Sequence, residues 1–78
     1  MLPALTDREN QILNLLANGL TNREISCNLV ISEATVENYI HHIFVKLGIS
    51  NRSQAVAYVY RMQIVLANLL VQDGGNPS

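Results

Sequence analysis

The chain has little of what exported or membrane-spanning proteins are made of. Its single cysteine excludes an internal disulfide, and nothing in the sequence suggests export. No apolar run reaches the roughly 18 residues that a membrane-spanning helix needs, and the N-terminus lacks a basic-then-apolar signal pattern. We therefore expect a soluble cytoplasmic protein that makes no membrane contact.

Charge is also scarce. Charged residues make up 14% of the 78-residue chain and hydrophobic residues 49%, which argues against disorder. Five Lys and Arg against six Asp and Glu give a formal net charge of −1, so the basic excess typical of nucleic-acid binders is missing. The length suits one domain, which buries only about 60–65% of the surface of its unfolded chain. A partner subunit could therefore add appreciable stability.

Catalytic and metal-binding patterns are lacking too. No nucleophile beside a base, glycine-rich phosphate loop or carboxylate pair is present, so we expect no enzymatic activity and no cofactor. Glu37 and His41 lie one helical turn apart beside His42, but structural zinc needs four ligands and the only thiol, Cys27, is on another predicted helix. We expect no metal. A redox role for Cys27 is the weaker alternative to a tolerated small residue, because Arg23 is its only evident basic neighbour.

The sequence does contain four segments with helical signals. Apolar residues recur at helical spacing over 7–18, 22–29 and 33–47, and a fourth segment, 52–71, runs without Gly or Pro. They predict an all-α, compact four-helix helix-turn-helix domain over residues 1–73 with an extended apolar fourth helix. The tail, 74–78, is expected to be disordered.

Polar residues mark where these helices begin. Thr6 with Glu9, and Thr21 with Glu24, each have the spacing of a capping box, in which side chains of the first turn satisfy free backbone N–H groups. Ser32 is placed to cap the third helix in the same way. Thr21 to Ile40 therefore reads as two short helices joined by a tight turn, the geometry that places a helix in the DNA major groove.

The fourth segment is apolar on almost every side. One stripe consists of Ala55, Val59, Met62, Leu66 and Leu69. Three preceding helices cover one face only, and a helix that is apolar all round needs cover all round. We expect this stripe to be the contact of a homodimer; the alternative is that the last turns fold back on the core.

The order of several short motifs resembles the DNA-binding domain of the LuxR family of bacterial transcription regulators. The motifs are LTDRE, ANGL, TNREIS, ISEATVENY, KLGI and NRSQA, and they cover about residues 5–62. The resemblance implies a four-helix bundle whose third helix reads DNA and whose fourth helix often forms a dimer contact.

Carried over from the family, positions 37, 38 and 41 are the expected base-edge contacts. Asn38 could pair with adenine, and His41 with a base or, when protonated, a phosphate. Residues at helix N-termini favour phosphate oxygens, and Lys46 and Arg52 are candidate phosphate contacts, although Arg52 could equally pair with Glu9. The predicted DNA-contacting set is Thr21, Asn22, Arg23, Ser32, Ala34, Thr35, Glu37, Asn38, His41, Lys46 and Arg52.

Several positions depart from the family pattern. Glu37, Tyr39, Val45 and Asn28 stand where the family commonly has basic residues or histidine. Glu37 either reads a C·G pair through cytosine N4 or weakens binding by repelling phosphates. These departures and the net charge motivate a rival hypothesis, a protein-interaction module that keeps the helix-turn-helix scaffold with weak or no DNA binding.

The leading hypothesis is a sequence-specific DNA-binding domain that acts as a dimer on double-stranded DNA. The chain has no room for a sensing domain ahead of the helix-turn-helix, so it is either a fragment of a larger regulator or a stand-alone protein. An activator would also contact RNA polymerase, but the sequence reveals neither the operator nor whether the protein activates or represses.

Overall fold

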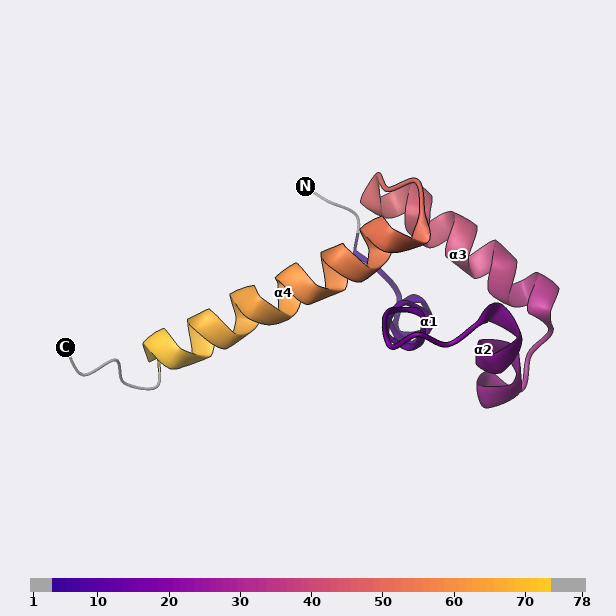
Figure 1. The fold of residues 1–78 in the computed structure, drawn as a ribbon, viewed down its shortest axis with the longest axis horizontal. Helices are drawn as coiled ribbons and strands as arrows, with labels where there is room; N and C mark the ends of the chain where they lie inside the picture. Colours follow the sequence, from indigo (N-terminus) through magenta and orange to yellow (C-terminus); the bar gives the residue numbers. More distant parts are fainter. Residues whose placement is uncertain (1–3, 74–78) are drawn as a thin grey trace.

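Residues 4–73 are described by a computed structural model, and they form four helices and no strand (Figure 1). The helices are α1 (Asp7–Ala17), α2 (Asn22–Leu29), α3 (Glu33–Leu47) and α4 (Arg52–Asp73). The predicted all-α helix-turn-helix class is confirmed. α1 ends one residue earlier than expected and α4 extends to Asp73; the predicted tail, 74–78, lies outside the described residues.

The predicted capping residues begin the first three helices. The Thr6 and Thr21 side chains accept from the backbone N–H of Glu9 and Glu24, whose carboxylates accept in return, so that both capping boxes are closed. Ser32 Oγ accepts from Thr35 N at 3.1 Å at the start of α3. These bonds satisfy backbone donors that a helix start leaves free. The first turn of each helix is therefore specified locally by the sequence.

The core lies around α1, which contacts each of the other three helices. Ile12 and Ile25 are fully buried, as is Val36, and Ile43 is nearly so. The remaining buried apolar residues are Leu13, Leu16, Ala55 and Val59. The helical stripes predicted for the first three helices thus point inward and meet one another.

The α2–α3 turn has an unusual backbone. Val30 closes α2 in the left-handed conformation, φ 58° and ψ 50°, and is 88% exposed. Its neighbour Ile31 is half-buried against the core and donates its N–H to the Ser26 carbonyl at 3.0 Å. Ile31 is therefore the apolar residue that fills this corner, while Val30 points into solvent.

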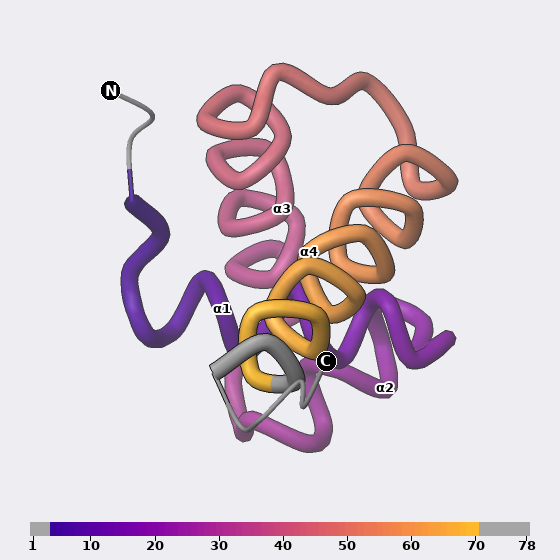
Figure 2. Tube along the Cα trace, turned by 90° about the vertical axis from the view of Figure 1, so that its left-hand side faces the viewer, coloured from indigo at the N-terminus to yellow at the C-terminus, as the bar shows by residue number. Residues whose placement is uncertain are grey.

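α4 leaves the body of the domain halfway along its length. In Figure 1 it projects along the long axis, away from the other helices, and in Figure 2 this projecting part points at the viewer. Every side chain from Tyr60 to Leu70 is exposed. The alternative that the last turns fold back on the core is therefore wrong. In Figure 1 α1 is seen end-on while α4 runs across the view, so the two helices cross and α1 covers only the part of α4 near the crossing.

The projecting helix does not resemble a membrane span. Among the described residues, no helix combines the length and the apolar character that crossing a bilayer requires.

Candidate nucleic-acid interface

The start of α2 is tied to the start of α4. The Arg52 guanidinium donates to the Leu20 carbonyl and to Asn22 Oδ1, the latter at 3.3 Å. Thr21 N donates to Glu24 Oε1 at 2.8 Å, and this hydrogen bond from the Thr21 backbone lowers the pKa of the Glu24 carboxyl. Predicted residues from two distant segments therefore lie together at this corner, and the bond between Arg52 and Asn22 fixes both side chains.

A second cluster of predicted residues lies at the start of α3. The hydroxyls of Ser32 and Thr35 lie 2.9 Å apart, beside the free N–H groups of the first turn. Ala34 is exposed next to them. This end of α3 therefore offers hydroxyl and backbone donors, the groups that commonly contact nucleic-acid phosphates.

Beyond its first turn, α3 presents a polar side to solvent. Glu37, Asn38 and His41 are exposed, and Val45 further along is 67% exposed. The buried residues Val36 and Ile43 lie on the opposite side, so one helix separates core from surface cleanly. The three positions expected to contact base edges are thus all free to meet a ligand.

A hollow on α3 is lined by two residues outside the predicted DNA-contacting set, Tyr39 and His42. The hollow measures about 300 Å³, and its other lining residues are Thr35 and Asn38. His42 is exposed, and its ring centroid lies 6.1 Å from that of His41. The spacing of 35, 38 and 42 along one helix was the available signal for this side of α3.

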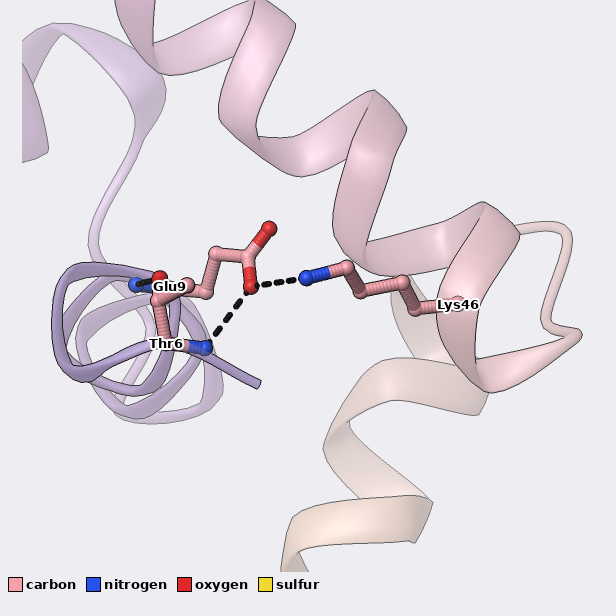
Figure 3. A network of polar contacts seen from close by, with 3 residues as sticks. All are labelled: Thr6, Glu9 and Lys46. Carbon is pink, nitrogen blue, oxygen red and sulfur yellow. Dashed lines mark hydrogen bonds and ion pairs between the residues drawn. The ribbon is translucent and has the colours of Figure 1, made fainter. Parts of the chain in front are cut away.

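Lys46 makes an ion pair that was not predicted for it. Its Nζ donates to Glu9 Oε1 at 2.7 Å, and the same oxygen accepts from Thr6 N at 2.9 Å (Figure 3). The side chain of Glu9 is only 6% exposed. The hydrogen bond from Lys46 lowers the pKa of the Glu9 carboxyl most, and the hydrogen bond from Thr6 N lowers it further. Arg52 does not pair with Glu9, the alternative considered for it, because Lys46 occupies the carboxylate and Arg52 bonds to Leu20 and Asn22.

These contacts leave the exposed side of α3 poor in positive charge. Lys46 is neutralised by Glu9, while Glu33 and Glu37 are exposed on α3 itself. Arg23 is the exposed basic residue of α2, and Arg61 lies on the projecting part of α4. The exposed side of α3 therefore carries two free carboxylates, while its one cation, Lys46, is already paired.

The predicted dimer contact must be shortened. Ala55 is fully buried and Val59 is 9% exposed, because both pack in the core of their own chain. They cannot meet a second subunit, and their inclusion was wrong. Met62, Leu66 and Leu69 are exposed and remain candidates. A groove of 260 Å³ between α1 and α4 is lined by Asn10, Leu13, Asn14, Tyr58, Val59, Met62, Gln63 and Leu66.

Comparisons with known proteins agree with this architecture. Residues 3–59 match the family described as bacterial regulatory proteins, luxR family. The chain is 47% identical over 60 residues to the spore germination protein GerE of Bacillus subtilis, covering 77% of this chain and 81% of GerE. It is 39% identical over 62 residues to the DNA-binding transcriptional activator DevR/DosR of Mycobacterium tuberculosis, covering 80% of this chain.

A solved structure shares the fold as well. The response regulator ChrA of a heme-sensing two-component system superposes with a TM-score of 0.72 at 43% identity, covering 78% of this chain and 30% of ChrA. The chain also spans only 29% of DevR/DosR. With the matched motifs, the capped α2–turn–α3 unit and these similarities in place, the chain belongs to the luxR family of bacterial regulatory proteins.

Proposed function

We propose that the chain binds double-stranded DNA sequence-specifically, with α3 in the major groove and α2 over the backbone. As a luxR-family helix-turn-helix domain, it is of the DNA-binding, transcription-regulating type. Bacterial DNA lies in the cytoplasm, so this function carries a cytoplasmic location with it.

The observation that carries the proposal is the exposed side of α3. Asn38 and His41 face solvent next to the hydroxyls of Ser32 and Thr35, on a helix whose other side is buried. Helix-turn-helix proteins place the second helix in the groove with its N-terminal residues at base edges. Asn38 has the side chain that pairs with adenine N6 and N7.

The proposal includes a homodimer formed by α4. Its projecting part exposes Met62, Leu66 and Leu69 along one stripe, and exposed apolar surface of this extent is typical of an interaction site. A two-fold dimer would place two copies of α3 about 34–36 Å apart, one turn of DNA. If the regulator is an activator, RNA polymerase is a further partner.

The charge distribution predicts a shallow dependence of affinity on salt. Each phosphate neutralised contributes about 0.9 to the slope of log K against log salt. Lys46 is held by Glu9, and Arg23 and Arg52 are the remaining predicted basic contacts of each subunit. We expect weak non-specific binding; a measured slope of about ten or more per dimer would contradict this account.

The test is selection from random duplex DNA at low and moderate salt, followed by sequencing of the bound fraction. A repeat with one-turn spacing is the expected product. The absence of any enriched sequence at low salt would favour the rival function, a protein-interaction module. Glu33 and Glu37 on the exposed side of α3 are the observation that supports this rival.

A substitution separates the two functions further. Glu37→Lys exchanges a carboxylate for a cation where α3 would meet DNA, so we expect affinity for any duplex to rise and the salt slope to increase by about one per subunit. Arg61→Glu changes charge on the projecting helix and serves as the control. An unchanged affinity of Glu37→Lys would count against the placement of α3.

A further inference from the structure

Two adjacent histidines lie on the surface that the proposed function assigns to DNA. His41 and His42 are both exposed, and His42 lines the hollow on α3 with Thr35, Asn38 and Tyr39. They are the only histidines of the chain. Histidine is the side chain whose charge ordinarily changes between about pH 5 and 8. Protonation of both would add two positive charges to α3.

Two added positive charges would exceed the fixed net charge of α3 in magnitude. α3 carries Glu33, Glu37 and Lys46, a sum of −1, and Lys46 is already bound to Glu9. Glu37 is one helical turn before His41, and Lys46 is one turn after His42.

The helices packed against α3 bring charged groups of both signs. α1 carries Asp7, Arg8 and Glu9, and α2 carries Arg23 and Glu24. Glu9 is held by Lys46 and Glu24 by the capping box at Thr21, so each of these carboxylates is engaged by a partner other than the histidines. Protonated imidazoles are therefore the source of new positive charge on the exposed side of α3.

We propose that His41 and His42 both contact DNA, that their ligands are backbone phosphates flanking the base-reading positions, and that DNA binding takes up protons through them. This inference rests on the proposed function and adds His42 to the contact surface. A protonated imidazole donates from both ring nitrogens, and hydrogen bonds between charged partners are shorter and stronger than neutral ones. DNA would bind the protonated chain more tightly, and bound DNA would in turn favour protonation.

The experiment measures affinity of the 78-residue chain for a fluorescent duplex between pH 5.5 and 8 at constant ionic strength. We expect log K to rise as the pH falls, with a slope equal to the number of protons taken up and limited to two per subunit. Between the ends of this range the affinity of a dimer should increase at least about tenfold. Circular dichroism at each pH shows whether the chain stays folded.

Variants assign the effect to the pair. His41→Gln and His42→Gln should each reduce the slope, and the double variant, which contains no histidine, should bind with little dependence on pH. His42→Lys should bind tightly at pH 8 because a lysine carries its positive charge throughout this range. Equal affinity of the unaltered chain at all pH values, or a slope that persists in the double variant, overturns the inference. Absence of DNA binding at every pH would instead contradict the proposed function.

Discussion

The two halves of α4 have similar apolar content and opposite surroundings. In the first half, Ala55 and Val59 are buried against the body of the domain. In the second, Leu66, Leu69 and Leu70 are each more than half exposed, although Leu66 and Leu69 continue the same helical stripe. The difference arises because α1 crosses α4 and does not run beside it, so the second half of α4 extends past the other helices (Figure 1). An apolar stripe therefore shows that a helix needs cover, while the direction in which its neighbours cross it decides whether its own chain supplies that cover.

The family match divides α4 at the same place. It ends at residue 59, the last buried position of the helix among the described residues, so the projecting part lies beyond the matched residues. A substitution can therefore be placed either in the body of the domain, up to residue 59, or in the projecting part of α4 that begins at Tyr60.

The largest effect is expected from a charge placed in the covered half. Ala55→Glu would bury a carboxylate where no space or partner is available, at a cost above about 3 kcal/mol in the free energy of unfolding. We expect loss of the cooperative thermal transition measured by circular dichroism. Ala57→Glu, two residues later and exposed, is the matched control and should stay within about 0.5 kcal/mol. Equal effects of the two would contradict the burial assigned to α4.

The same charge in the projecting half should act on association and not on folding. If α4 forms the proposed dimer, Leu69→Glu should weaken it at least about tenfold, because a carboxylate in an apolar contact is costly. Sedimentation equilibrium measures the dissociation constant. Asn68→Glu introduces the same charge at the neighbouring exposed position on another side of the helix, and should leave the dimer nearly intact. A dimer that survives Leu69→Glu would place the contact elsewhere.

The ion pair of the body should have a smaller effect on stability. Lys46→Met removes the partner of a buried carboxylate and should lower the free energy of unfolding by about 1–3 kcal/mol at pH 7 in urea. Lys46→Arg, which keeps the charge, is the control and should lose less.

The same pair gives stability a defined pH dependence. The pKa of Glu9 is lowered from 4.5 in the folded chain, chiefly by Lys46, so ionised Glu9 stabilises the fold above pH 4.5. This contribution is lost as the pH falls below 4.5 through the lower folded value. Lys46→Met should flatten that loss; an identical acid profile would show that Lys46 does not set the pKa.

Local signals explain why the fold was predictable. Thr6, Thr21 and Ser32 specify helix starts through hydrogen bonds within three or four residues, and the periodic apolar positions specify the buried sides. The site was less predictable, because Lys46 and Glu9 are 37 residues apart and the sequence does not show which cation reaches a given carboxylate. The predicted dimer contact on α4 wrongly included Ala55 and Val59 for the same reason, since burial by another helix depends on residues far away in the sequence.

The smallest effect is expected at the α2–α3 turn, where Val30 adopts the left-handed backbone at φ 58°. A β-branched side chain is strained there, by roughly 1–2 kcal/mol, and Val30 is 88% exposed, so no packing offsets the strain. Val30→Gly should raise the free energy of unfolding by about 0.5–1 kcal/mol, part of the relief being lost to the greater entropy of an unfolded glycine. The variant is measured by thermal unfolding beside Val30→Ala, which keeps a Cβ and should gain less. A destabilised Val30→Gly would mean that the turn depends on the stiffness of valine, and because this turn lies in the body, neither variant should change the association of α4.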